Sequence, residues 1–144
     1  MTDVQARAAR FIRAFNDHDE NAMRVLNDPN HTLTAPGGVR LRGAETTSYP
    51  TQWIKACPDA KLTVENEISC GEWVVQEVKF EGTHQGPLES PMGSIQATGK
   101  TLAVQSALIT RYQNDLAIET KIYFDAAEVL NQLGLLATPV AATV

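Results

Sequence analysis

Cysteine is scarce in this sequence of 144 residues, and its two copies, Cys57 and Cys70, stand in no redox or metal-binding spacing. We expect two reduced thiols in a cytoplasmic protein, with a disulfide between them as the alternative. The histidines His18, His31 and His84 also make no ligand spacing with cysteine or carboxylate. The sequence therefore predicts no metal site.

Long apolar runs and blocks of like charge are missing as well. No apolar run approaches the roughly 18 residues that a membrane helix needs, which argues against a membrane protein. Residues 1–5 lack both the basic start and the apolar stretch of a secretory signal. The net charge of −5 disfavours nucleic acid and anionic lipid as partners.

Nucleotide-binding motifs are also absent. The run Gly99-Lys100-Thr101 resembles the end of a phosphate-binding loop, but Ser94 occupies the position where that loop needs a glycine. The run also precedes a predicted strand, whereas the loop must lead into a helix. We therefore reject a phosphate-binding loop here.

The length and composition of the chain fit one domain spanning 1–144. The apolar fraction of 43% and the length are enough for a single core with a small cavity. Residues 137–144 show no periodic pattern and are expected to fray.

Two helices are expected at the N-terminal end. Apolar residues at helical spacing predict an amphipathic helix over about 3–16, with Thr2 as its cap. Asp17, followed by Glu20, is predicted to cap a short second helix that ends at 27–30. Two short strands, a turn and a third helix then follow.

The two short strands are expected over 31–35 and 39–41, around a Pro-Gly-Gly turn. The third helix is expected over about 44–56. Pro50 should start or kink that helix, because proline lacks the backbone N–H that a helix interior needs.

Four longer runs predict an antiparallel sheet. Apolar and polar residues alternate over 61–70 and 72–84, which indicates strands with one covered face. Two β-rich runs, 100–112 and 117–124, surround a polar turn and lead into a capped helix over 125–134. In the first run, the apolar face is expected to hold Leu62, Val64, Ile68 and Cys70.

Residues 85–99 are rich in glycine and proline and are predicted to form a long mobile loop, of the kind that often serves as a lid. Helices followed by a meander of strands are typical of an α+β fold. A strongly bent sheet that wraps a helical layer leaves a conical space at its open end, where a pocket is expected.

Three motifs carry a resemblance to a known family: 82–88 (GTHQGPL), 98–100 (TGK) and 125–134, which starts at Asp125 and ends in Gln-Leu-Gly. With these motifs the chain resembles the SnoaL-like polyketide cyclases of the nuclear-transport-factor-2-like superfamily over nearly its whole length. The resemblance implies a cone of about three N-terminal helices, a curved mixed or antiparallel sheet and a C-terminal helix. Ketosteroid isomerase and limonene-epoxide hydrolase share that cone.

The chain departs from the family at the residues that do the chemistry. In the family's cyclases, a histidine on the penultimate strand and an aspartate on the last strand act as acid and base. The matching positions here hold Leu108 and Ile122, and Thr120 stands where the last strand usually has another histidine. The family's acid/base pair is therefore replaced by apolar residues.

His84 and Asp125 are the candidate catalytic residues. His84 ends a strand on its inner face, and an imidazole there is suited to acid or base work near neutral pH. The alternative is a histidine bonded to a loop carbonyl. Asp125 is either a pocket acid or the cap of the last helix, since Asp125 and Glu128 form a capping box.

The candidate substrate-binding residues combine polar and apolar side chains. Polar residues on otherwise apolar strand faces indicate either a satisfied hydrogen-bond network or a pocket with polar groups. Aromatic residues one helical turn apart suit a flat ligand, although core packing explains Trp53 equally well. The predicted residues are Tyr49, Trp53, Gln76, Leu108, Tyr112, Thr120 and Ile122.

The opposite sheet face is apolar enough to need a cover. Trp73 and Val75 share it with Ala107 and Ile109. A second copy of the chain would cover such a face, so we expect a homodimer.

Two functions remain open, with a closed-core interaction module as a third. The first, implied by the resemblance, is a cofactor-independent enzyme of cyclase, isomerase or hydrolase type that acts on a small apolar carbonyl-bearing molecule. The second is a non-catalytic protein that binds a small apolar molecule, because Leu108 and Ile122 make the pocket more apolar. A cavity with His84 beside a second titratable group favours the enzyme, a purely apolar cavity favours the binding protein, and the absence of a cavity favours the interaction module.

Overall fold

The computed structural model of the protein describes residues 3–91 and 93–136. Along the chain, the elements are α1 (Asp3–Asn16), α2 (Glu20–Arg24), β1 (Asn27–Ala35), β2 (Val39–Arg42), the 3₁₀ helix η1 (Gly43–Thr47), α3 (Ser48–Ala56), β3 (Lys61–Cys70), β4 (Trp73–Thr83), β5 (Leu88–Ser90), β6 (Gly93–Ile95), β7 (Thr101–Gln113), β8 (Leu116–Phe124) and α4 (Ala126–Gln132). The expected cap at Thr2 and the expected frayed tail 137–144 lie outside the described residues.

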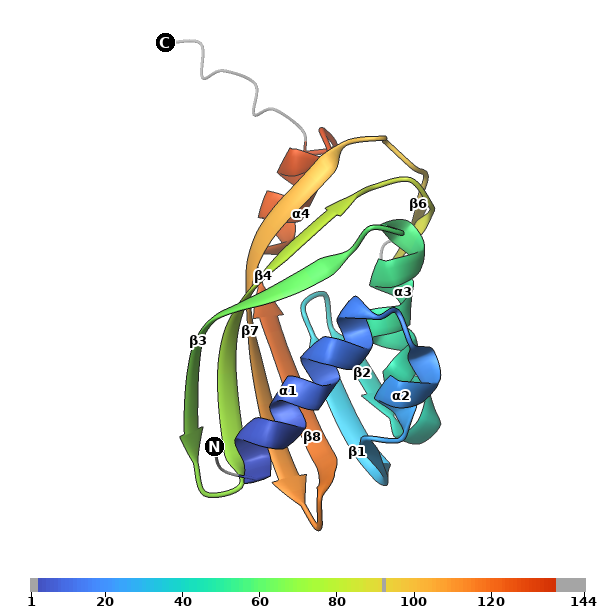
Figure 1. Ribbon diagram of the computed structural model, residues 1–144. Coiled ribbons are helices and arrows are strands. Elements are labelled where there is room, and N and C mark those ends of the chain that lie inside the picture. The colour runs from blue at the N-terminus through green and yellow to red at the C-terminus, as the bar shows by residue number, and fades with distance from the viewer. Residues whose placement is uncertain (1–2, 92, 137–144) are drawn as a thin grey trace, which may run out of the picture.

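Within the described residues, six strands form one curved mixed sheet in the order β2-β1-β8-β7-β4-β3. Strands β1 and β8 run parallel, and the other neighbours are antiparallel. Helices α1, α2 and α3 lie over one face of the sheet, and α4 lies at its upper end (Figure 1). This arrangement confirms the predicted α+β cone.

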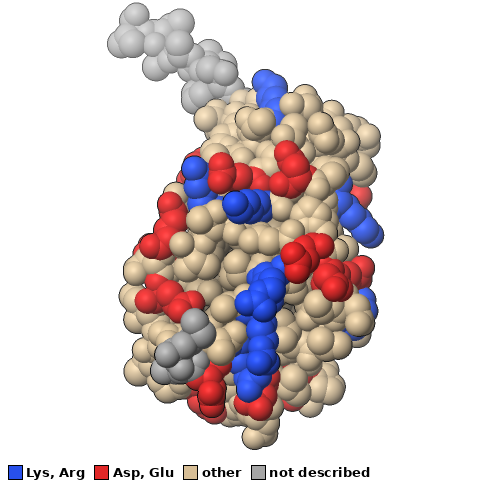
Figure 2. Space-filling model, in the orientation of Figure 1, with Lys and Arg blue, Asp and Glu red and all other residues tan. Residues whose placement is uncertain are grey.

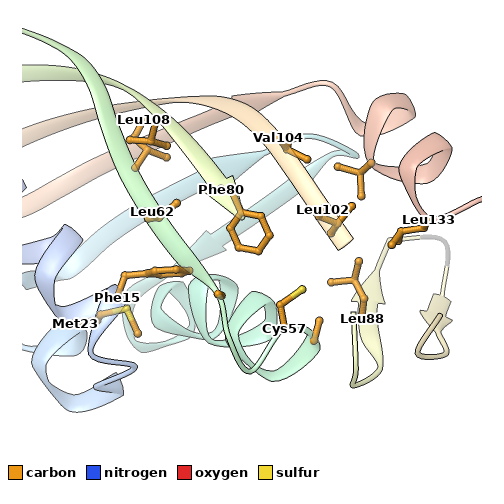
Figure 3. Packing of buried hydrophobic residues seen from close by; sticks show 14 of the residues in the cluster. Phe15, Met23, Cys57, Leu62, Phe80, Leu88, Leu102, Val104, Leu108 and Leu133 are labelled. Carbon is orange, nitrogen blue, oxygen red and sulfur yellow. The ribbon is translucent and has the colours of Figure 1, made fainter. Parts of the chain in front are cut away.

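The core fills the space between the sheet and the helices. In Figure 3, Phe15 of α1 points toward Leu62, Phe80 and Leu108 of the strands. Phe15 is 3% exposed and Val78 of β4 is 0% exposed. Full burial of such a side chain stabilises the fold by roughly 1.5–3 kcal/mol, so this apolar interior holds the two layers together.

A β-bulge in β3 changes which residues face the core. The pairing with β4 shifts between Val64 and Asn66, so Ile68 pairs with Val75 on the outer face. Ile68 is 59% exposed. The predicted apolar face of this strand is therefore wrong beyond Val64, because one extra residue reverses the alternation.

The helix boundaries differ from the expectation in two places. Asp19, not Asp17, caps α2 by accepting a hydrogen bond from the Ala22 N–H at 3.0 Å. The expected helix over 44–56 is divided into η1 and α3. Pro50 lies in the first turn of α3, where its missing N–H breaks no helical hydrogen bond.

Two segments predicted to be irregular contain strands. The segment 27–30, expected to end a helix, already belongs to β1, where Asn27 pairs with Ala117 of β8. The expected loop 85–99 contains the hairpin β5–β6. Its start is held by backbone hydrogen bonds, because the Gln85 and Gly86 N–H groups both donate to the Ala56 carbonyl at 3.0 Å.

Two side-chain amides bind strand backbone as a neighbouring strand would. The Asn16 side chain donates to the Leu62 carbonyl at 3.0 Å and accepts from the Leu62 N–H at 2.8 Å. Gln132 of α4 bonds both backbone groups of Ala103 in the same way, at 2.8 and 2.9 Å. These paired bonds fix α1 and α4 to the sheet.

The surface carries charges of both signs. Figure 2 shows a row of basic side chains, bordered by acidic ones, across the face that carries α1. Both cysteines are free, as predicted: Cys57 is buried and Cys70 is exposed. None of the helices in the described part of the chain is long and apolar enough to cross a membrane.

The Asn16 contact provides a test of how α1 is held. Asn16→Ala removes two hydrogen bonds to β3, and we expect the free energy of unfolding to fall by about 1–2 kcal/mol in urea denaturation. The matched control is Asn66→Ala, which removes one exposed hydrogen bond to Glu77 and should change stability by less than about 0.5 kcal/mol. Equal losses in both variants would show that the Asn16 contact has no special role.

Candidate functional site

Three adjoining hollows run from the mouth of the cone into its interior. The innermost has a volume of about 50 Å³ and the next about 70 Å³. The outermost, of about 510 Å³, opens toward solvent at the mouth. The two inner hollows share lining residues, namely Phe11, Pro50, Leu108 and Ile122. The middle and outer hollows share Tyr49, Trp53, Phe124 and Val129.

Aromatic side chains line the middle hollow, which we call the neck. The Trp53 ring packs edge-on against Phe80 and Phe124, with centroids 5.4 and 5.7 Å apart. Tyr49 lies 6.5 Å from Trp53, also edge-on. Burial raises the pKa of Tyr49, and a hydrogen bond with the Trp53 indole opposes that shift. The neck is therefore an apolar, aromatic passage.

Two turns meet at the mouth. Gly37, between β1 and β2, has a φ of +89°, and a Cβ there would lie 2.9 Å from the Pro91 ring of the β5–β6 hairpin. Only glycine suits both the backbone conformation and the close approach. This contact brings the hairpin against the β1–β2 turn beside the outer hollow.

The innermost hollow, which we call the polar end, collects the polar residues predicted from the strands. Gln76, Tyr112 and Thr120 all line it. Gln76 Nε2 donates to the Glu67 carboxylate at 2.9 Å. Burial raises the pKa of Tyr112 to about 12, so its hydroxyl keeps its proton at neutral pH. The positive charge of Arg7 opposes that shift in the pKa.

The seven predicted substrate-binding residues all lie along the neck and the polar end. Leu108 and Ile122 pair directly across β7 and β8. Both residues line the neck and also the polar end, so they lie at the boundary between these two hollows. The strand alternation was sufficient to place them there, while their binding role stays a prediction.

His31 is a candidate site residue that the sequence reasoning missed. It lies on β1, is 2% exposed and lines the polar end. Its Nδ1 lies 2.8 Å from Thr46 Oγ1, and its Nε2 lies 2.8 Å from Thr120 Oγ1. The sequence did hold one signal for His31. It lies two residues before Leu33, so both side chains point to the same face of the strand, and Leu33 is buried in the core.

The hydrogen-bond partners decide which ring nitrogen of His31 carries the proton. The Thr46 hydroxyl donates its only proton to the Gly43 carbonyl at 2.8 Å, so it accepts from His31 Nδ1–H. In the neutral ring, Nε2 is then the free base and accepts the Thr120 proton. Burial lowers the pKa of His31 to about 4, against a smaller raising effect of Asp28, so the ring is neutral at pH 7.

His84 lies away from all three hollows. It is 0% exposed, and its Nδ1 accepts a hydrogen bond from the Thr98 N–H at 3.2 Å. Burial lowers the pKa of His84, and the carbonyl groups of Gly86 and Ile95 oppose the shift. Those carbonyls lie outside ordinary hydrogen-bond geometry, so Nε2 has no partner in the described part of the chain. This position favours the structural interpretation over catalysis.

Asp125 caps α4, which is one of the two roles predicted for it. Its Oδ1 accepts hydrogen bonds from the backbone N–H groups of Ala127 at 2.9 Å and Glu128 at 3.2 Å. The side chain is exposed and lies outside the lining of the three hollows. Among the described residues, no group of three histidine, cysteine or carboxylate side chains is placed to hold a metal ion.

Comparison with known proteins agrees with this geometry. The family model described as SnoaL-like polyketide cyclase matches residues 6–133. A search of curated protein sequences found no match. Solved structures with the same fold include a putative SnoaL-like polyketide cyclase from Jannaschia sp. CCS1, with 17% identity and a TM-score of 0.81 over 95% of this chain and 94% of that one.

Two Streptomyces proteins are similar as well. TsrD from Streptomyces laurentii has 24% identity and a TM-score of 0.78, over 93% of this chain and 96% of that one. IdmH, a putative polyketide cyclase from Streptomyces antibioticus, has 24% identity and a TM-score of 0.73, over 91% of this chain and 98% of that one. At these identities the likeness concerns the fold.

The lowered pKa of His31 predicts a pH-dependent stability. Between pH 6.5, the ordinary histidine value, and about 4, the unfolded chain binds a proton that the folded protein excludes. Stability should therefore fall as the pH drops through this window, by about 3 kcal/mol in total from this residue.

The measurement is urea denaturation at several pH values for the wild type and His31→Gln. His84 contributes a change of the same sign, so the difference between the two proteins isolates His31. We expect the wild-type curve to be steeper between pH 6.5 and 4. Parallel curves would contradict the assignment.

Proposed function

The chain belongs to the SnoaL-like polyketide cyclase family, and on this premise we propose that it is a cofactor-independent enzyme acting on a small apolar carbonyl-bearing molecule. The single observation that carries the proposal is the polar end itself. There, His31 and the titratable Tyr112 line one hollow behind an apolar neck. A histidine beside a second titratable group suits proton transfer better than passive binding.

The substrate's size and orientation follow from the hollows. The neck and the polar end are small, whereas pockets that bind drug-sized ligands have volumes of about 300–1,000 Å³. We propose that the substrate's reacting end enters the polar end, while its apolar part lies in the neck between Trp53 and Phe124 and reaches the mouth. Its carbonyl oxygen then lies near Tyr112.

The proposed hydrogen-bond donor to the carbonyl oxygen is the Tyr112 hydroxyl. Burial raises its pKa to about 12, so it carries its proton at neutral pH. In a dry hollow, one fixed donor aimed at a developing oxyanion contributes substantially to catalysis.

The proposed proton acceptor is Thr120 together with His31. A proton that leaves the substrate passes to Thr120 Oγ1, while the Thr120 proton moves along the 2.8 Å contact to His31 Nε2. The imidazolium that forms is unfavourable in isolation, because burial disfavours its charge. The negative charge on the substrate oxygen offsets that cost, and the proton returns to the product.

A binding protein is the second candidate, and one observation favours it. The apolar Leu108 and Ile122 stand at the positions of the family's acid and base, in the middle of the cavity. A cavity with that lining holds an apolar ligand without transferring its protons.

We test the function by native mass spectrometry of freshly purified protein, followed by denaturation to release and identify anything bound. The released molecule, or an analogue of it, is then assayed for turnover. His31→Gln and Tyr112→Phe should each lower kcat/KM by about 100-fold or more, because each removes a proton-transferring group.

The matched control is Asp125→Asn, since asparagine also caps helices and Asp125 lies outside the cavity. This variant should keep wild-type turnover. A stoichiometric ligand that the wild type binds and leaves unchanged would instead identify a binding protein.

We also infer a homodimer formed through the outer sheet face. Val75 pairs with Ile68 on one side and Ile109 on the other, which makes an apolar row across three strands. Arg111 and Lys121 flank this row and lie 5.6 and 5.7 Å from the centre of the Trp73 ring. The helices lie over the opposite face (Figure 1).

Light scattering at micromolar concentration should give a dimer for the wild type and a monomer for Ile109→Glu, which places a charge in the apolar row. The control is Val25→Glu, which changes an apolar residue that is 62% exposed on the chain segment after α2. It should remain dimeric. A monomeric wild type would contradict the inference.

A further inference from the structure

The positions of the hydrogens at the polar end define what kind of ligand group fits there. A threonine hydroxyl ordinarily rotates and serves as donor or acceptor as its partner requires. Thr120 has no such freedom, because its proton is directed at His31 Nε2 at 2.8 Å. Its remaining lone pair is what it offers to the hollow.

That orientation is imposed by a chain of hydrogen bonds that starts in the backbone. The Gly43 carbonyl takes the Thr46 proton, Thr46 Oγ1 takes the His31 Nδ1 proton, and Nε2 takes the Thr120 proton. A backbone carbonyl only accepts, so reversing the direction in the neutral ring would break the hydrogen bond from Thr46 to the Gly43 carbonyl.

We infer that Thr120 Oγ1 is a fixed hydrogen-bond acceptor at the polar end, and that the ligand of this cavity places an O–H or N–H donor against it. A simple ketone or hydrocarbon leaves this acceptor unpaired. Sites built to bond a polar hydrogen reject analogues that lack it far more strongly than they reject a change in size.

Gln76 supports the same ligand chemistry independently. Its Nε2 donates to Glu67, and because a carboxylate only accepts, the amide orientation is fixed and Oε1 is turned away from Glu67. Gln76 lines the same hollow as Thr120. The polar end is therefore lined by two side chains of fixed orientation, Thr120 and Gln76, beside the protonated hydroxyl of Tyr112.

The inference rests on the proposed function only in that the cavity takes a ligand, and it holds for an enzyme or a binding protein. If the protein is an enzyme, the proton that Thr120 receives comes from an oxygen or nitrogen of the substrate. The substrate class is then a carbonyl compound that also carries a hydroxyl, enol or N–H group within reach of Thr120.

The first test needs no ligand. Nitrogen-15 NMR of the histidine rings at pH 7 distinguishes the two neutral tautomers and the charged ring, and His31→Gln identifies the His31 signals. We expect the tautomer with the proton on Nδ1. A proton on Nε2, or on both nitrogens, would overturn the inference, because Thr120 would then be free to donate.

The second test compares pyrrole and furan, two rings of nearly equal size of which only pyrrole has an N–H donor. NMR titration of the wild type should show pyrrole binding about tenfold more tightly, the value of one good hydrogen bond in a dry site. Thr120→Val should reduce the ratio of the two dissociation constants to about one, and Thr120→Ser should preserve it.

Thr110→Val is the matched control, since it removes a hydroxyl from the same hollow but leaves the Thr120 acceptor in place. It should keep most of the preference for pyrrole. Equal binding of both probes by the wild type, an unchanged preference in Thr120→Val, or no binding of either probe would overturn the inference. These results are independent of turnover, so a failure here is distinguishable from failure of the proposed function.

Discussion

The hydrogen bonds of His31 are the interaction on which the closed end of the cone depends. The ring lies on β1 and connects Thr46 of η1 with Thr120 of β8, so it joins the helical layer to the last strand. A buried imidazole needs both nitrogens satisfied, and here two threonines satisfy them. Burial keeps the ring neutral, and the two bonds direct the Thr120 hydroxyl, so the hydrogen-bonding groups that the cavity offers follow from the position of His31.

The shape of the cavity depends on irregularities in the strands. The bulge after Val64 in β3 and the extra residue that β8 places opposite Arg111 and Tyr112 of β7 increase the local twist and bend the sheet around the helices. The edge-on packing of Trp53 against its aromatic neighbours narrows the cavity at the neck. A narrow neck therefore separates a wide mouth from a small polar end.

The lining of the cavity changes from apolar to polar along its depth. Leu108 of β7 and Ile122 of β8 pair across the strands and carry no titratable group. The polar groups lie deeper, on β1, β4, β7 and β8, around His31 and Thr120. Apolar residues at the Leu108 and Ile122 positions add to the core, so the polar groups are confined to one end of the cavity.

The α+β order, the boundaries of most strands and the side chains that line the cavity could be predicted from the sequence alone. Apolar residues repeat every two positions in a strand and about every 3.6 in a helix, and such repeats are local properties of the chain. Alternation placed Gln76, Tyr112 and Thr120 on the inner face correctly. It failed at Ile68, where one extra residue in β3 reversed the faces.

Which histidine lines the cavity became clear from the assembled fold alone. His84 follows a core-facing strand pattern yet lies among loop backbone, while His31 meets Thr46 and Thr120, which are 15 and 89 residues away along the chain. Contacts over such separations have no local signal, because they depend on how β1, η1 and β8 come together. The pKa and the tautomer of His31 follow from that assembly.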